Sequence, residues 1–297
     1  MMLFVAGVLL GLIPLFSKNI DSIGGMAVSM WRALIPSVIL VGYILFSSSS
    51  KIRDNVAHVL RRPRAIFGIC MYGFFTTSLV STCYIMSLNY ISIALSVTLV
   101  YTVSPIVALL IEWIYYKKPP SFMKIYYASL VICGIFIILK VAPWEFDTNF
   151  YIGFAFALVA GIGIVLYNYL SKGFDKSINE EVILSGAFVV SGILGVIYMM
   201  AIQIFFDSKI QFIPDNNLEI VHLLLLGVFA TLIPYWLIQK VLRKSQISTY
   251  EVTLYFTLEP VISIVIGSLA FNETLSMIQN VGVFIVLTTI LSMQKEQ

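Results

Sequence analysis

The sequence contains unusually little charge. Only 11% of its 297 residues are charged and 60% are hydrophobic, whereas about a quarter of the residues in a soluble domain are charged. So few polar groups could not cover the apolar surface of a soluble protein of this length, and we expect lipid to be its solvent. The net charge of +3 and the lack of a basic tail argue against a nucleic-acid partner.

Residues for catalysis, metal binding and cross-linking are also scarce. The two histidines, His58 and His222, belong to no His-Glu-x-x-His pattern, and Asp-Asp-x-x-Asp and Gly-x-Ser-x-Gly are absent. No Gly-x-x-x-x-Gly-Lys-Ser/Thr loop is present to bind ATP. We therefore expect no enzyme activity, metal site or cofactor. Cys70, Cys83 and Cys133 fall in apolar runs, which predicts buried free thiols.

Long apolar runs, in contrast, are plentiful. A helix needs about 20 apolar residues to cross a bilayer. The first run lacks a basic leader and is followed by many others, so we expect it to be a span and not a cleaved signal. The predicted spans are 2–18, 25–46, 65–86, 91–115, 122–141, 149–171, 182–205, 219–240, 247–270 and 276–293.

One connection, from Ser47 to Arg64, is longer than the others and strongly basic. Within it, Ile52, Val56, Val59 and Leu60 are spaced to share one face of a helix. The segment is either a short helix on the membrane surface or a solvated basic loop.

Lysine and arginine are distributed unequally between the two sides of the predicted spans. With the N-terminus in the cytoplasm, fourteen of the 18 lie on the cytoplasmic side, Lys18, Lys140 and Lys209 lie outside, and Arg32 lies within a span. This bias predicts a multi-pass protein of the cell (inner or plasma) membrane with both termini in the cytoplasm. The fourteen are Lys51, Arg53, Arg61, Arg62, Arg64, Lys117, Lys118, Lys124, Lys172, Lys176, Lys240, Arg243, Lys244 and Lys295.

The sequence also repeats itself. Residues 5–7 (Val-Ala-Gly) recur at 159–161, an offset of 154, and residues 97–99 (Val-Thr-Leu) recur at 252–254, an offset of 155. The repeats, 1–143 and 144–297, each contain five predicted spans. Because five is odd, the second repeat enters the membrane from the opposite side. The predicted fold is an all-α polytopic membrane protein, with ten transmembrane helices in two inverted five-helix repeats.

Local motifs within this pattern resemble a known family. Arg32 lies in Met-Trp-Arg-Ala-Leu (30–34), Glu259 lies in Leu-Glu-Pro-Val (258–261), and Phe-Asn-Glu-Thr-Leu (271–275) follows. Ser104-Pro105 occupies the place of Glu259-Pro260 in the first repeat. The whole chain resembles the EamA-type branch of the drug/metabolite transporter superfamily. The resemblance implies transport of small organic metabolites, such as amino acids or related compounds, often by export.

Arg32 and Glu259 are the deepest charges in the predicted spans. A charge in the hydrocarbon core costs roughly 2.5–3.5 kcal/mol on insertion scales, so each needs a partner or a function. We hypothesise that they interact across the repeat interface, directly or through substrate or water. The alternative is an ion pair that only holds helices together.

Further polar and aromatic residues are predicted to complete a substrate-binding site. Any one of these aromatics has core packing or interfacial anchoring as its simpler role. Pro105 and Pro260 remove backbone donors at matching places and are predicted to break their helices there. Together with Arg32 and Glu259, the substrate-binding candidates are Tyr72, Thr76, Tyr101, Ser104, Tyr167, Asn168, Tyr235, Trp236 and Tyr255.

These features predict a secondary-active or facilitative transporter that works by alternating access through a central cavity between the repeats. Glu259 is the candidate for proton coupling, because burial disfavours an ionised carboxylate. Exchange and facilitated diffusion remain alternatives, as do an intramembrane enzyme and a non-transporting scaffold. The expected partners are a small-molecule substrate and the lipid bilayer, and no sequence feature predicts an oligomeric state.

Overall fold

The computed structural model describes residues 2–114, 117, 119, 121–138, 148–206, 211–244, 258–272 and 276–295. Every secondary-structure element in these ranges is a helix, as predicted. The elements are α1 (Met2–Leu10), α2 (Ile13–Ser17), α3 (Gly25–Phe46), α4 (Ser50–Leu60), α5 (Pro63–Gly73), η1 (Phe74–Ser81), α6 (Thr82–Tyr90), α7 (Ile93–Ile114), α8 (Phe122–Ile138), α9 (Thr148–Lys172), α10 (Glu180–Phe206), α11 (Asn217–Gly227), η2 (Val228–Leu232), α12 (Ile233–Lys244), α14 (Leu258–Phe271) and α15 (Met277–Lys295).

Six described helical segments are long and apolar enough to cross a membrane. Two shorter apolar segments, Met2–Ser17 and Glu259–Phe271, accompany them. Large apolar side chains point outward, including Phe46 at 90%, Leu269 at 79% and Ile204 at 73% exposure. Lipid would cover such side chains, and the chain is a multi-pass membrane protein. The six segments are Gly25–Phe46, Pro63–Tyr90, Ile93–Ile111, Thr148–Lys172, Glu180–Ala201 and Asn217–Arg243.

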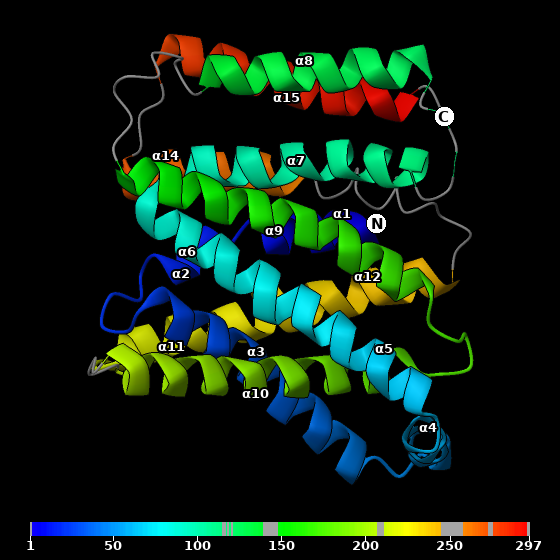
Figure 1. The fold of residues 1–297 in the computed structure, drawn as a ribbon. Helices are drawn as coiled ribbons and strands as arrows, with labels where there is room; N and C mark the ends of the chain where they lie inside the picture. Colours follow the sequence, from blue (N-terminus) through cyan, green and yellow to red (C-terminus); the bar gives the residue numbers. More distant parts are fainter. Residues whose placement is uncertain are drawn as a thin grey trace.

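The basic connection forms a helix, α4, and not a loop. Ile52 and Val59 are buried on its apolar face, as the spacing predicts. Leu60 departs from that prediction, because it is 67% exposed at the C-terminal end of the helix. We call the end of the molecule that holds α4 the α4 end, and the opposite end, which holds α2, the α2 end (Figure 1).

Successive long segments run back and forth between these two ends, so that α1 begins and α15 ends toward the α4 end (Figure 1). The helices α8 and α15 pack against each other at one edge of the molecule. Toward the opposite edge, α3 from the first half packs along α10 from the second. Between these two pairs lie α1, α6, α7, α9, α12 and α14, whereas α4 lies beyond α10 at a corner of the molecule (Figure 1).

Two glycines bring helices from different halves unusually close. A Cβ atom added at Gly73 would lie 2.4 Å from the carbonyl oxygen of Ala187 on α10. A Cβ atom added at Gly227 would lie 2.8 Å from Cβ of Ile35 on α3. The two glycines are 154 residues apart, which is the repeat offset. The same close contact therefore recurs once in each half.

A π-helical segment follows each of these glycines. η1 begins at Phe74 and η2 begins at Val228, again 154 residues apart. A π turn leaves backbone groups in need of partners and is often found at functional sites. In η2 the hydroxyl of Thr231 donates to the carbonyl of Leu226, 2.9 Å away and five residues back.

The helix break predicted at Pro105 is not observed. α7 remains helical through Pro105, since its helix extends from Ile93 to Ile114. Pro260 is the third residue of α14, and residues 251–257 before that helix lie outside the described residues. The break predicted at Pro260 therefore stays a prediction. The observed irregularities are instead η1 and η2, which contain no proline.

Candidate functional site

Arg32 is buried at the interface between the two halves. Its side chain is 2% exposed. Nε donates to the Thr231 hydroxyl at 2.8 Å, and Nη1 donates to the Ser81 hydroxyl at 3.0 Å. Thr231 belongs to η2 in the second half, and Ser81 belongs to η1 in the first. The guanidinium therefore joins the two π-helical segments, which the sequence analysis did not anticipate.

Glu259 is the second buried charged residue of this region and is 1% exposed. Its carboxylate accepts a hydrogen bond from the hydroxyl of Tyr101, on α7 of the first half. No direct ion pair joins Arg32 to Glu259, although both side chains are described. The direct form of the hypothesised interaction is therefore wrong, because hydroxyl groups occupy the described polar contacts of both side chains. An interaction through substrate or water stays a prediction.

Three of the predicted tyrosines form an aromatic row. The ring centroids of Tyr72 and Tyr167 are 6.1 Å apart, and those of Tyr167 and Tyr235 are 6.2 Å apart. Phe188 continues the row at 5.9 Å from Tyr235. The rings come from α5, α9, α12 and α10, so residues of both halves contribute. All three tyrosines are buried.

Several buried polar atoms among the described residues have no hydrogen-bond partner. Such atoms are rare in proteins and are usually satisfied by water or a ligand. Of these residues only Asn168 is a predicted substrate-binding residue, although Thr77 and Thr231 are 154 residues apart and so occupy equivalent places in the two repeats. The atoms relevant here are Thr77 Oγ1, Ser78 Oγ, Thr102 Oγ1 and Asn168 Oδ1.

The remaining candidates occupy different positions. Ser104 is buried and donates to the carbonyl of Gly161 at 3.0 Å, linking α7 to α9. The Thr76 hydroxyl donates to the carbonyl of Tyr72, one turn back. Trp236 is half-buried and donates through Nε1 to Glu181 at 3.1 Å, on a different side of α12 from the aromatic row. Tyr255 lies outside the described residues.

The polar core is asymmetric between the repeats. The repeat offsets align Arg32 with Gly186 and Glu259 with Ser104. Thr231 receives the Arg32 hydrogen bond, whereas Thr77, its counterpart, has a buried hydroxyl without a partner. Each half therefore supplies one charged residue, and neither charge has a copy in the other half.

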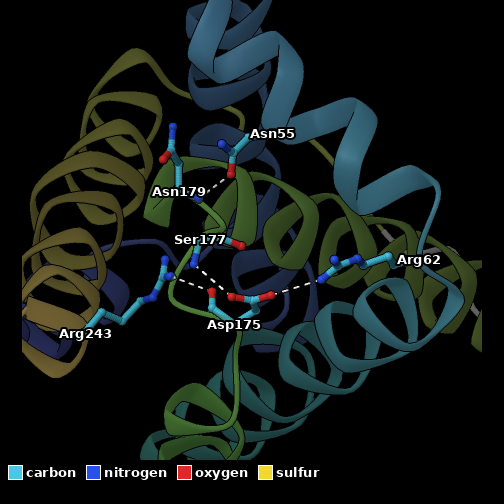
Figure 2. A network of polar contacts seen from close by, with 6 residues as sticks. All are labelled: Asn55, Arg62, Asp175, Ser177, Asn179 and Arg243. Atoms are coloured by element: carbon cyan, nitrogen blue, oxygen red, sulfur yellow. Dashed lines mark hydrogen bonds and ion pairs between the residues drawn. The ribbon is translucent and has the colours of Figure 1, made fainter.

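At the α4 end, polar contacts also join the halves (Figure 2). Arg62 Nη1 lies 3.0 Å from Asp175 Oδ2, and Arg243 Nη2 donates to the backbone oxygen of Asp175 at 2.8 Å. Asn55 accepts from the backbone N–H of Asn179 at 2.8 Å. Hydrogen bonds from the backbone N–H and hydroxyl of the neighbouring Ser177, and then Arg62, hold the pKa of the Asp175 carboxyl below its usual value.

The α2 end has a corresponding set of contacts. The Ser22 hydroxyl donates to Glu219 and accepts from the backbone N–H of Asp215 at 3.2 Å. Trp31 Nε1 donates to the backbone oxygen of Phe212 at 2.6 Å. The repeat offset aligns residue 21, beside Ser22, with Asp175. Equivalent loops thus contact the opposite half at each end.

The described residues contain no group of three or more histidine, cysteine, aspartate or glutamate side chains that could hold a metal ion. The chemistry available at this site is therefore that of buried hydrogen-bond donors and acceptors, one cation, one carboxyl group and aromatic faces. Such a set suits reversible binding of a small polar molecule with an apolar part.

Comparison with known proteins agrees with the two-part architecture. The model of the EamA-like transporter family matches residues 1–140 and again residues 151–293. A solved structure titled only "Crystal structure of protein" is similar with a TM-score of 0.68 and 16% identity, and the match covers 100% of this chain and 98% of that one. No curated protein sequence matches.

Proposed function

Because the chain belongs to the EamA-like transporter family, we propose that it carries a small organic metabolite by alternating access through a central cavity between its halves. We further propose ten crossings in inverted repeats (1–143 and 144–297), in the cell membrane with both termini in the cytoplasm. Each of the ten predicted spans overlaps a described helical segment, which supports this topology. The recurrence of the Gly73 contact at Gly227 supports it further.

The observation that carries the proposal is the buried polar core between the halves. Arg32 and Glu259 are opposite charges, and each accepts or donates a hydrogen bond with a hydroxyl group of the other half. Unpartnered polar atoms lie buried on η1 and α7, the elements that supply Ser81 and Tyr101. A purely structural core would be expected to satisfy these atoms, because each unsatisfied buried group costs roughly 1–3 kcal/mol. Substrate and water supply the missing partners in our proposal.

The two charges suggest the substrate class. A guanidinium binds carboxylate groups well, and a buried carboxylate binds ammonium groups. Arg32 and Glu259 are not paired with each other, so each can exchange a hydroxyl partner for substrate. An amino acid or a related zwitterion carries both complementary groups, and the aromatic row would accept its apolar part.

Alternating access requires that one end open while the other stays closed. Contacts between the halves occur at both ends of the described structure, so we propose that they are the two closures. Opening the α4 end would separate Arg62 from Asp175, and opening the α2 end would separate Ser22 from Glu219. Both sets consist of a few polar contacts, of which the Arg62–Asp175 pair is about half exposed. Such contacts can break without exposing a hydrophobic core.

Glu259 is our candidate for proton coupling, and this part of the proposal is tested separately. In vesicles that contain the purified protein, a coupled carrier moves protons with substrate and responds to a pH gradient. Glu259→Gln should weaken transport, because the carboxylate also binds the substrate, and the transport that remains should no longer respond to the pH gradient. Transport that is independent of pH in the unchanged protein would leave exchange or facilitated diffusion as the mechanism.

The proposal as a whole is tested by ligand screening followed by flux. Purified protein is heated with the twenty amino acids and with small organic acids and amines, and any stabilising compound is then assayed for flux in vesicles. We expect at least one stabilising compound to be transported, and Arg32→Gln to lose both effects. A compound that binds but is chemically altered would indicate an enzyme, and binding without flux would indicate a scaffold or receptor.

A further inference from the structure

A large cavity lies at the α4 end, away from Arg32 and Glu259. Its volume is about 1,050 Å³, and α5, α9 and residues 173–178 supply most of its walls. None of the predicted substrate-binding residues lines it. The polar core therefore does not account for this cavity.

The mouth of the cavity is basic. Arg61, Arg62 and Arg64 all line it and are exposed. The only acidic residue among the lining residues is Asp175, and it is paired with Arg62 at 3.0 Å. Arg61 and Arg64 have no acidic partner in the described part of the chain. The mouth thus keeps an excess of positive charge.

The start of α5 adds to this positive potential. α5 begins at Pro63, directly at the mouth, and Arg62 at its N-cap makes no capping hydrogen bond through its side chain. Its first turn contains no acidic residue. Pro63 has no N–H, and the N–H groups of Ala65 and Ile66 donate to the carbonyl of Arg62. The contribution of the α5 start is therefore mainly its helix dipole, whose positive end favours an anion such as phosphate.

The interior of the cavity is apolar and has the depth of one lipid leaflet. Below the arginines, the walls include Phe75, Ile111, Leu170 and Phe174. Phe75 lies eleven positions after Arg64, which corresponds to a depth of about 16 Å at the rise of a helix. This depth is similar to half the thickness of the hydrocarbon core of a bilayer, which is about 30 Å in total.

The cavity is flanked by side chains that point away from the protein. Phe67 on α5 is 65% exposed and Ile114 on α7 is 75% exposed. In a membrane these side chains would contact lipid, so an acyl chain could enter from the bilayer without crossing a polar surface.

From these features we propose that the cavity binds an anionic phospholipid. The phosphate lies between Arg61, Arg64 and the N-terminus of α5, and an acyl chain extends along Leu170 and Phe174 toward Phe75. Basic pockets between membrane helices suit anionic head groups in this way. The cavity shares Arg62 and Asp175 with the proposed closure of the α4 end, but lipid binding needs only that the chain lie in a bilayer, and it is measured without substrate.

The test measures lipid binding to purified protein without substrate, by native mass spectrometry and by thermal stabilisation. The unchanged protein should retain phosphatidylglycerol at least tenfold better than phosphatidylcholine. The double variant Arg61→Gln/Arg64→Gln should lose roughly tenfold to thirtyfold of the phosphatidylglycerol binding. Lys51→Gln/Arg53→Gln is the matched control, because it removes the same charge from the exposed side of α4, and it should change binding little.

A second variant examines the apolar part. Ala65→Phe places a ring in the cavity and keeps every arginine, so it should weaken retention of both lipids while the protein stays folded. Equal retention of the two lipids by the unchanged protein would overturn the proposal. An equal loss in the α4 control would also overturn it, since diffuse surface charge would then explain the preference. Equal stabilisation by free glycerol phosphate would indicate a phosphate site and not a lipid site.

Discussion

The contact between Gly73 and α10 makes the strongest quantitative prediction about how the halves pack. A Cβ atom at residue 73 would lie 2.4 Å from the oxygen of Ala187 and 3.0 Å from both its carbonyl carbon and its Cα. All three are backbone atoms, so no rotation of a side chain can relieve the overlap. In Gly73→Ala, α5 and α10 must move apart.

Two opposing contributions determine how much Gly73→Ala changes the free energy of unfolding. Overpacking a close contact costs typically 1–3 kcal/mol, and a backbone obstacle places this site near the upper value. Replacing a helical glycine by alanine recovers about 1 kcal/mol of helix propensity. The expected net loss is therefore about 2 kcal/mol, which corresponds to a fall in Tm of several degrees.

Two other glycines provide matched comparisons in the same assay, which is heat unfolding of purified protein in one detergent. Gly227→Ala meets Cβ and Cγ2 of Ile35 at 2.8 Å, a side-chain obstacle, so it should lower Tm by less than Gly73→Ala. Gly42→Ala on α3 meets nothing within 4 Å and should leave Tm unchanged or slightly raised. A Tm for Gly73→Ala equal to that of Gly42→Ala would refute the close packing of the halves.

Two further predictions concern the ends of the molecule. The pKa of Asp175 is lowered in the folded protein, so this carboxylate contributes stability that is present above its unfolded pKa, about 3.9, and is lost as the pH falls through its folded pKa. Asp175→Asn should therefore lose less Tm than the unchanged protein between pH 5 and pH 3. An equal fall of Tm with pH in the two proteins would contradict the pairing in Figure 2. Asn216 caps α11, because its side chain accepts a hydrogen bond from the Glu219 N–H at 2.8 Å and donates one to the Glu219 carboxylate at 3.2 Å. Asn216→Ala should lower the free energy of unfolding by about 1 kcal/mol. Asn217→Ala, at the exposed next residue, should leave the free energy of unfolding unchanged.

Much of the fold could be predicted from the sequence, because hydrophobic length is a strong signal in a membrane protein. The segment 25–46 was predicted to its last residue and coincides with α3. The repeat offset correctly paired Gly73 with Gly227, although it gave no indication of what these glycines contact. The π-helical segments were missed, since η1 and η2 depend on tertiary partners such as Arg32 and not on a local breaker.

The buried charges of the candidate site could be predicted from the sequence, but their hydrogen-bond partners could not. Arg32 and Glu259 were predicted as the deepest charges because charged side chains are rare inside membrane spans, and both side chains are buried. Their partners, Thr231 and Tyr101, could not be deduced, because side-chain direction depends on how the helices are rotated against each other. The direction of Trp236 could not be predicted for the same reason: it was expected in the substrate site, but its indole on α12 points toward Glu181.

The central claim is that the buried polar core becomes accessible to each side of the membrane in turn, and thiol labelling measures this without knowledge of the substrate. Thr102→Cys places a nearly isosteric thiol at a fully buried, unpartnered position of α7, in a background where Cys70, Cys83 and Cys133 are serine. Ala94→Cys, buried on the same helix, is the control. We predict that a polar, impermeant reagent modifies Thr102→Cys when applied to either side of a sealed vesicle and leaves Ala94→Cys unmodified. Labelling from one side only, or from neither, would contradict alternating access.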